Sequence, residues 1–278
     1  MNIKVLFFDF DHTTLQKDQV FISPRNMFAL REAMKKGILC IPCTGRSADM
    51  FPPQIQDERG FRYWVSASGC RIIDKGTDQV IYKGGCFTPE QAAQICRMYE
   101  GQMIYSEIAA EGKLYFERSV NDALHLFPVP PHHVWYVLTG RQIPINGKLS
   151  DYFLNHRLEV EKFNLYGVPE EKQEPFMEQL KSMDFVNFLD GTPFNMQFTS
   201  SALDKVAAIQ ALLDHLGLTF EHVMSIGDSI IMDGCIMEKS ALAVAVGNAP
   251  EELKDIAHDV VNDFDKDGLA EAIEKHLL

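Results

Sequence analysis

The most constraining feature of the sequence is an apolar run that ends directly in two acidic residues. Residues 5–8 are Val, Leu, Phe and Phe, and Asp9, Phe10 and Asp11 follow at once. Such a run is typical of a buried strand, and in an extended chain Asp9 and Asp11 point to the same side. Two like charges this close need a cation or a shared proton. The simple alternative is a solvated loop after the first strand.

Apolar runs alternate with helix signals at both ends of the chain. Ser23 and Pro24 start a helix that Gly37 ends, because these residue types favour the N-cap, the first turn and the C-terminal stop. Apolar runs at 38–44 and 62–67 are typical of strands covered on both faces. Further strands are expected at 223–228, 242–246 and 260–261, with helices between them. We predict an α/β fold, a Rossmann-like wound parallel sheet to which both chain ends contribute.

The middle of the chain has a different pattern. Thr88, Pro89 and Gln91 form a capping box for a helix to about residue 100, and a second helix is expected at 169–183. Short alternating segments at 104–105, 113–117 and 161–166 are typical of an antiparallel sheet with one solvated face. The segment 127–131 is Pro-rich and predicts an irregular connection. We expect an inserted α+β domain at 84–191, between core segments 1–83 and 192–278.

Composition limits the partners and the compartment. The 278 residues include 26 Lys plus Arg against 39 Asp plus Glu, a net charge of −13. This balance opposes electrostatic binding to nucleic acid or to an anionic membrane. The sequence has neither a secretory signal pattern nor an apolar run of bilayer length. We therefore expect a cytoplasmic protein with a small-molecule partner; the oligomeric state is left open.

The cysteines include one pair with redox or zinc-binding spacing. Cys40 and Cys43 form a C-x-x-C. The segment around them resembles a strand, which sends residues three apart to opposite faces. The six cysteines are too few for a disulfide scaffold of this size, so we expect free thiols.

Further polar residues follow other predicted core strands. Thr44 and Gly45 follow the second strand and can offer a hydroxyl and close backbone N–H groups to a phosphoryl oxygen. Lys205 begins a later helix, where a cation opposes the helix dipole by up to about 1 kcal/mol, so an anion nearby would explain it. Carboxyl ends of parallel strands are where wound sheets bind ligands. An anion bound at these strand ends is one interpretation; the alternative is a solvated surface Lys that tolerates the dipole.

Two more acids complete the pattern. Asp228 stands at the carboxyl end of the strand expected at 223–228, and Asp233 lies five residues further on. Together with Asp9 and Asp11 they make a set of carboxylates that suits a hard cation, Mg²⁺ being the first choice. Each acid alone could equally be a helix cap or a turn residue.

The ordered motifs resemble the haloacid dehalogenase (HAD) superfamily, specifically the Cof-type phosphatases with an inserted α+β cap. The motifs are Asp9-Phe10-Asp11, Thr44-Gly45-Arg46, Lys205, and Gly227-Asp228 with Asp233. Ser68-Gly69 stands where relatives carry Asn-Gly, and Gly247-Asn248-Ala249 matches a similar Gly-Asn-Ala. The resemblance covers nearly the whole chain, and it implies a HAD core with a cap at 84–191.

The resemblance also implies roles for these residues. Asp9 would be the nucleophile that forms an aspartyl-phosphate, and Asp11 would be the general acid and then the general base. Thr44, Gly45 and Lys205 would hold the phosphoryl oxygens. Mg²⁺ would be bound by Asp9, the Asp11 backbone carbonyl and Asp228, with Asp233 supporting its waters. The implied function is Mg²⁺-dependent hydrolysis of a small phosphorylated metabolite, with a sugar phosphate as the leading class.

The chain departs from the family pattern at several positions. His12 replaces a usual Gly, Thr14 a usual apolar residue, Val206 a usual Gly and Met232 a usual Asn, and the spacing from Asp228 to Asp233 is one residue longer. Since every charged group is retained, we expect an active enzyme. The alternatives are a catalytically impaired phosphate-binding or regulatory protein on the same fold, and a receiver-like signalling domain.

Two other motifs have simpler interpretations. Residues 263–268 followed by Glu274 fit an EF-hand calcium loop, but a strand rather than a helix is expected before them. We expect instead a final helix from Gly268 with Asp267 as its cap. His132 and His133 follow the Pro-rich connection without a nearby acid in the sequence, and we expect them in a solvated loop.

Overall fold

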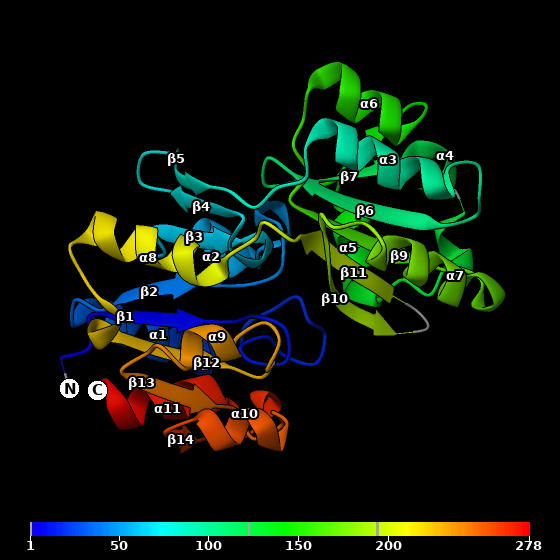
Figure 1. Cartoon of the computed structure of the whole chain (residues 1–278). Coiled ribbons are helices and arrows are strands. Elements are labelled where there is room, and N and C mark those ends of the chain that lie inside the picture. Colours follow the sequence, from blue (N-terminus) through cyan, green and yellow to red (C-terminus); the bar gives the residue numbers. More distant parts are fainter. Residues whose placement is uncertain (1, 122, 193–194) are drawn as a thin grey trace. The chain divides into compact units, whose positions relative to one another are not determined.

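The computed structural model describes residues 2–121, 123–192 and 195–278. The chain forms two compact units (Figure 1). The first, the core, contains Met1–Arg46, Phe51–Lys83 and Asp204–Leu278, so both chain ends belong to it. The second, the cap, contains Gly84–Leu203 together with the short segment Ser47–Met50.

A five-stranded parallel sheet forms the centre of the core, in the order β14-β13-β12-β1-β2. Its strands are β1 (Val5–Phe8), β2 (Leu39–Pro42), β12 (Val223–Gly227), β13 (Leu242–Ala245) and β14 (Asp259–Val260). They are short and almost wholly buried, as expected for a sheet covered by helices on both faces. The predicted α/β wound sheet is confirmed.

The core helices are α1 (Pro24–Lys35), α2 (Pro53–Asp57), α8 (Lys205–Leu216), α9 (Gly234–Met237), α10 (Glu251–Ile256) and α11 (Gly268–His276). Helix α1 begins as predicted, because the Ser23 side chain accepts a hydrogen bond from the Asn26 N–H and Pro24 occupies the first turn. It packs on β2 and against α11. Helix α8 lies on the other face, where Ile209 and Leu213 share a buried cluster with Val5 and Phe7.

One predicted strand has a different partner. Strand β3 (Tyr63–Ser66) pairs antiparallel with β4 (Arg71–Asp74), which pairs with β5 (Gln79–Lys83) in a separate three-stranded sheet. Its parallel contact with the main sheet is one bridge between Cys43 and Val65. The apolar run at 62–67 was correctly identified as a strand. It was wrongly assigned to the parallel sheet, because burial on both faces does not fix strand direction.

The cap is built on a six-stranded sheet in the order β10-β11-β9-β6-β7-β8, antiparallel except between β7 and β8. The strands are β6 (Tyr105–Ala110), β7 (Lys113–Glu117), β8 (Ile143–Ile145), β9 (Lys162–Tyr166), β10 (Val186–Thr192) and β11 (Asn195–Ser200). The helices are α3 (Pro89–Tyr99), α4 (Arg118–Asn121), α5 (Pro131–Leu138), α6 (Leu149–His156) and α7 (Glu170–Lys181). The α+β character predicted for this region is confirmed.

Two local predictions for the cap have different outcomes. Helix α3 begins with the expected capping box, since Thr88 and Gln91 each bond the other's backbone N–H. His132 and His133, in contrast, are not in a loop: they lie in α5, and His133 contacts Glu107. That prediction was wrong because it considered only acids near these histidines in the sequence. Glu107 lies in β6, 26 residues before His133 in the chain.

Apart from the short segment Ser47–Met50, the chain passes from core to cap at Lys83/Gly84 and returns at Leu203/Asp204. The expected boundaries were 83/84 and 191/192. The cause of the later second boundary is strand β11, which pairs with β9 through residues 195–198 and so belongs to the cap sheet. Gly191 lies within β10 and is not a linker.

The cysteine pair has no redox geometry. Cys40 lies on β2 with its thiol toward the Leu30 carbonyl of α1, while Cys43 belongs to the cluster beneath α8 on the opposite face. Burial raises the pKa of both thiols to about 12. All six cysteines are free, as expected.

The EF-hand pattern does not form a calcium loop. Strand β14 precedes it, and Asp265 and Glu274 form ion pairs with Lys17 and Arg25. Helix α11 begins at Gly268 as predicted. Asp267 stands at its N-cap in a left-handed conformation (φ 61°) without a side-chain capping bond, so the predicted capping role was wrong.

Among the described residues, no helix combines the length and the apolar character that crossing a bilayer requires.

Candidate active site

The carboxyl ends of β1 and β12 bring three acids together. Asp9 follows β1 directly, Asp228 follows β12, and Asp233 precedes α9. One carboxylate oxygen from each lies within 4.8 Å of the others. Strands β1 and β12 are hydrogen-bonded neighbours, so their ends meet at one edge of the sheet. Residues more than two hundred positions apart therefore form one acidic cluster.

The electrostatics of this acidic cluster are unfavourable without a cation. Burial, followed by the charges of Asp233, Asp11 and Asp228, raises the pKa of Asp9 well above its ordinary value. Burial and then Asp233 raise the pKa of Asp228 to about 7. Carboxylates crowded in a buried position are stabilised in their charged form by a divalent cation. The oxygen-only donor set fits Mg²⁺.

Asp233 is held in place by the backbone of its own loop. Its Oδ2 accepts hydrogen bonds from the N–H groups of Asp228 (3.2 Å) and Ser229 (3.1 Å). Gly227 is required here, because a Cβ at that position would collide with the Asp233 carboxylate. Asp233 thus fixes the loop that carries Asp228, despite the longer spacing between these two acids.

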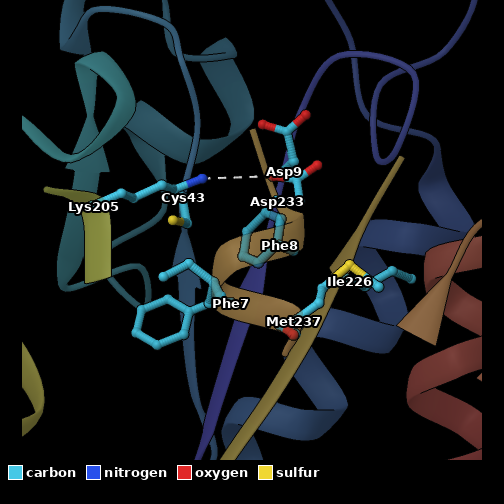
Figure 2. A pocket seen from close by; sticks show the side chains of 10 residues that line it. Phe7, Phe8, Asp9, Cys43, Lys205, Ile226, Asp233 and Met237 are labelled. Carbon is cyan, nitrogen blue, oxygen red and sulfur yellow. Dashed lines mark ion pairs between the residues drawn. The ribbon is translucent and has the colours of Figure 1, made fainter. Parts of the chain in front are cut away.

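Lys205 supplies a buried positive charge at the start of α8. Figure 2 shows its ammonium facing Asp233, 3.6 Å from Oδ1, with the Cys43 thiol beside it. The ammonium also donates to the Met232 carbonyl. Burial alone would lower the pKa of Lys205, but the neighbouring Cys43, Asp233 and Asp9 outweigh this effect and raise it. The Lys is therefore a fixed cation next to the acidic cluster.

Thr44 lies in the loop after β2 and is buried, with 1% of its surface exposed. Its Oγ1 accepts a hydrogen bond from the Arg46 N–H (3.3 Å), and its carbonyl accepts one from Ser68 (3.0 Å). Gly69 packs against Lys205, whose Cγ would lie 3.2 Å from a Cβ at that position. The Thr44-Gly45 loop, the turn at 67–69 and the start of α8 are therefore held together.

Asp11 is oriented differently from Asp9. Its carboxylate forms a two-point ion pair with the Arg46 guanidinium, with Nε 2.8 Å from Oδ2 and the second nitrogen on Oδ1. The side chain of Arg46 is buried, and it also donates to the Gln19 carbonyl (2.9 Å). The Asp11 carboxylate is thus separate from the three-acid cluster. No role was predicted for Arg46, and its one signal in the sequence is its place in the Thr44-Gly45-Arg46 motif after a predicted strand.

The loop after Asp11 explains two of the departures from the family pattern. His12 has a left-handed backbone (φ 54°), a conformation that glycine adopts most easily. Asn248 donates to the His12 carbonyl (2.9 Å), and the His12 ring packs edge-on against Phe264. Thr14 donates to the Asp9 carbonyl (2.6 Å), so its hydroxyl has a partner in a buried position.

Thr13 and Asn248, for which no site role was predicted, connect the loops around the acidic cluster. Thr13 donates to Asp228 (3.0 Å) and so joins the β1 loop to the β12 loop. Asn248 also accepts from the Phe264 N–H (3.0 Å) and so connects the loops after β1 and β14. Asn248 belongs to the Gly247-Asn248-Ala249 motif and Thr13 follows Asp11 by two residues, but only the folded structure gives their partners.

Known proteins resemble this chain along its whole length. A Bacillus subtilis 5-amino-6-(5-phospho-D-ribitylamino)uracil phosphatase is 24% identical over 100% of this chain and 97% of its own. A second phosphatase of that organism, YwpJ, is 25% identical over 99% of this chain and 100% of its own.

Solved structures share the fold. A haloacid dehalogenase-like hydrolase from Bacteroides thetaiotaomicron superimposes with a TM-score of 0.80 at 22% identity, covering 98% of this chain and 99% of the other. A HAD subclass IIB sugar phosphatase gives a TM-score of 0.76 at 22% identity, covering 98% of both chains. The family model for haloacid dehalogenase-like hydrolases matches residues 6–273. The chain belongs to the haloacid dehalogenase-like hydrolase family.

Proposed function

We propose that this protein is a Mg²⁺-dependent phosphatase that hydrolyses a small phosphorylated metabolite through an aspartyl-phosphate on Asp9. The observation that carries the proposal is the cluster of Asp9, Asp228 and Asp233 at one edge of the parallel sheet, with the Lys205 ammonium 3.6 Å from Asp233. A cation beside crowded carboxylates suits a ligand that brings both a metal and phosphoryl oxygens.

In the proposed reaction the Asp9 carboxylate attacks phosphorus and the ester oxygen leaves. Asp11 gives its proton to that oxygen, then takes one from the water that attacks the aspartyl-phosphate, releasing phosphate and restoring Asp9. Lys205 and the Thr44 hydroxyl hold phosphoryl oxygens through both steps. A positioned acid and base of this kind contribute typically 10²–10⁴-fold to the rate.

The metal would be held by Asp9, Asp228 and the Asp11 carbonyl, with Asp233 fixing the loop that carries Asp228. The raised pKa values of Asp9 and Asp228 support this assignment, because a bound cation removes the repulsion that raises them. When bound, Mg²⁺ neutralises charge on the phosphoryl group.

For the substrate we propose a phosphorylated sugar or polyol. The name of the B. subtilis relative describes a phosphorylated ribityl compound, and one structural neighbour is a sugar phosphatase. The net charge of −13 disfavours nucleic acid and anionic membranes as partners. Since every charged group of the motifs is present, we place the impaired-protein alternative second.

The test is hydrolysis of p-nitrophenyl phosphate with and without Mg²⁺, by the wild type and by Asp9→Asn. We expect turnover that requires the metal and that Asp9→Asn abolishes. A wild type inactive with Mg²⁺, Mn²⁺ and Co²⁺ would refute the proposal. A panel of sugar and polyol phosphates then identifies the preferred ester, with the highest kcat/KM expected within that class.

A further inference from the structure

A small cavity lies within the core, beside the acidic cluster. Its volume is about 10 Å³, close to the space that one water molecule needs. Figure 2 shows charged groups at one end of this cavity and apolar side chains at the other. Its polar lining residues are Asp9, Cys43, Lys205, Ser225 and Asp233. Ser225 has no part in the proposed function.

Ser225 brings a hydroxyl group to this cavity. It lies on β12 opposite Phe7 of β1 and is 4% exposed. Side chains alternate along a strand, so Ser225 and Gly227 share a face, and a Cβ at Gly227 would point at the Asp233 carboxylate. The Ser225 side chain therefore lies on the side of the sheet that carries Asp233, one alternate position, about 6.6 Å, further back along the strand.

The Ser225 hydroxyl has no hydrogen-bond partner among the residues that the structure describes. Buried polar groups in folded proteins nearly always have a partner, because an unpaired one costs its full desolvation energy. A hydroxyl that lines a cavity of this size can find that partner in a water molecule.

The Lys205 ammonium offers a second partner for such a water. It lies 3.6 Å from the Asp233 Oδ1, which is longer than a direct N–H···O hydrogen bond, and it donates to the Met232 carbonyl. An ammonium has three N–H donors, and a polar contact longer than about 3.5 Å is one that a water can bridge. The Lys205–Asp233 pair therefore suits the same water as the Ser225 hydroxyl.

The charges around the cavity favour water over an ion. The Lys205 ammonium repels a second cation, and the Asp9 and Asp233 carboxylates repel an anion. A water molecule can accept from the ammonium and donate to a carboxylate at the same time. Hydrogen bonds of about 2.8 Å on each side let it connect polar atoms about 5 Å apart.

We propose that the cavity holds one ordered water molecule, bound by the Ser225 hydroxyl, the Lys205 ammonium and the Asp233 carboxylate, and that Ser225 thereby positions Lys205. The water site stands on the geometry of the core alone. The role of Ser225 rests on the proposed function, in which Lys205 holds a phosphoryl oxygen. Ser225 contacts neither the substrate nor the metal in that reaction, so it is a positioning residue.

A high-resolution crystal structure of the full chain with Mg²⁺ tests the water directly. We expect electron density for one water within about 3 Å of both the Ser225 Oγ and the Lys205 Nζ. In the crystal structure of Ser225→Ala this density should be lost or weakened. An empty cavity in the wild type, an ion in place of the water, or a Ser225 hydroxyl bonded to a protein atom would each overturn the inference.

The role of Ser225 is tested by the ligand affinities of Ser225→Ala. Calorimetric titration measures the dissociation constant of inorganic phosphate at saturating Mg²⁺, and that of Mg²⁺ alone. We expect the phosphate constant to rise about 2- to 10-fold, which corresponds to the net loss of one hydrogen bond. The Mg²⁺ constant should stay unchanged, because the metal is assigned to Asp9, Asp228 and the Asp11 carbonyl. A general loss of structure would weaken the binding of both ligands.

Ser150→Ala is the matched control. Ser150 lies in α6 of the cap and is 1% exposed, and its hydroxyl likewise has no partner within the described part of the chain. We expect both dissociation constants to be unchanged in this variant.

Three results would overturn the role of Ser225: an unchanged phosphate constant in Ser225→Ala, equal losses of phosphate and Mg²⁺ affinity, or the same effect in Ser150→Ala. A wild type that neither binds phosphate nor hydrolyses p-nitrophenyl phosphate would instead reject the proposed function. The crystal structure would still decide whether the water is present.

Discussion

Buried carboxylates occur in both units, and their surroundings differ. In the cap, Glu107 is 1% exposed and accepts from three neighbours: His133 at 2.5 Å, and Tyr105 and Gln142 at 3.3 Å. In the core, Asp9 is 8% exposed and faces Asp228 and Asp233 within 4.8 Å. One carboxylate has donors around it, and the other has further carboxylates.

This difference separates a structural group from a functional one. A buried polar group with hydrogen-bonding partners supports the fold, whereas like charges in a buried position cost stability. The network around Glu107 joins α5 to the cap sheet. The acids at the ends of β1 and β12 carry an electrostatic cost that the Lys205 ammonium and, in the proposed function, a divalent cation offset.

Asp9→Asn removes the core carboxylate to which we assign the nucleophilic role. The change keeps the size of the side chain but removes the nucleophile, so kcat for p-nitrophenyl phosphate should fall about 10⁴-fold or more. Steady-state assays with Mg²⁺ measure this. The control is Glu107→Gln, the same carboxylate-to-amide change in the cap, which should keep kcat within about threefold. Comparable losses of kcat in both variants would contradict the distinction between a functional carboxylate in the core and a structural one in the cap.

The metal-free core should be less stable at higher pH. The pKa of Asp228 is 3.8 ordinarily and about 7 in the fold, so the unfolded chain ionises first as the pH rises. Its contribution to stability is present below about pH 4 and is lost as the pH rises to about 7, on the order of 4 kcal/mol. Urea denaturation in EDTA at pH 5 and pH 7.5 measures the part of this loss that falls between those two values, about 2.5 kcal/mol.

Asp228→Asn should flatten that pH dependence, because the titrating group is removed. Mg²⁺ should restore stability to the wild type, and more at pH 7.5 than at pH 5, because protons compete with the metal for the carboxylates. If the metal-free stability of the wild type changes between pH 5 and pH 7.5 in the same way as that of Asp228→Asn, this account of the cluster is contradicted.

Glu107→Gln tests whether the buried carboxylate of the cap stabilises the fold. The amide leaves His133 and Gln142 without a full set of acceptors, so the free energy of unfolding should fall by about 1–3 kcal/mol. Mg²⁺ should stabilise this variant by the same amount as the wild type. An unchanged unfolding midpoint would mean that the network contributes nothing to stability.

Exposed acids near the C-terminus give the smallest effect. Glu274 pairs with Arg25, and both side chains are about half exposed (44% and 47%). Glu274→Ala should change stability by less than about 1 kcal/mol. Calcium titration followed by thermal melting should give the same curve for this variant and for the wild type. A calcium-induced rise in Tm that disappears in Glu274→Ala would revive the EF-hand interpretation.

The sequence was sufficient where the signals are local. Ser23 and Pro24 define the start of α1, Thr88 and Gln91 that of α3, and apolar runs followed by acids mark β1 and β12. Each depends on residues within one turn or one strand. The parallel sheet then brings Asp9 and Asp228 together without further information, because neighbouring parallel strands end at the same edge.

Where the partners are distant in the chain, prediction failed. Arg46 pairs with Asp11 across 35 residues, and His133 with Glu107 across 26. Strand β3 was given the wrong partner, and the cap was predicted to end too early, because strand pairing is decided by tertiary contacts. Helix α5 was missed because the three prolines at 128–131 favour an irregular connection. The last of them, Pro131, is instead the first residue of the helix.

In the proposed reaction Asp9 carries the phosphoryl group, so the aspartyl-phosphate should be trapped when its hydrolysis is blocked. Asp11→Asn lacks the base for the second step, so it should accumulate the aspartyl-phosphate from ³²P-labelled p-nitrophenyl phosphate with Mg²⁺. After acid quenching we expect protein-bound label that hydroxylamine removes, and none in the double variant Asp9→Asn/Asp11→Asn. Label that persists in the double variant, or no label in Asp11→Asn while it still releases p-nitrophenol, would contradict the account.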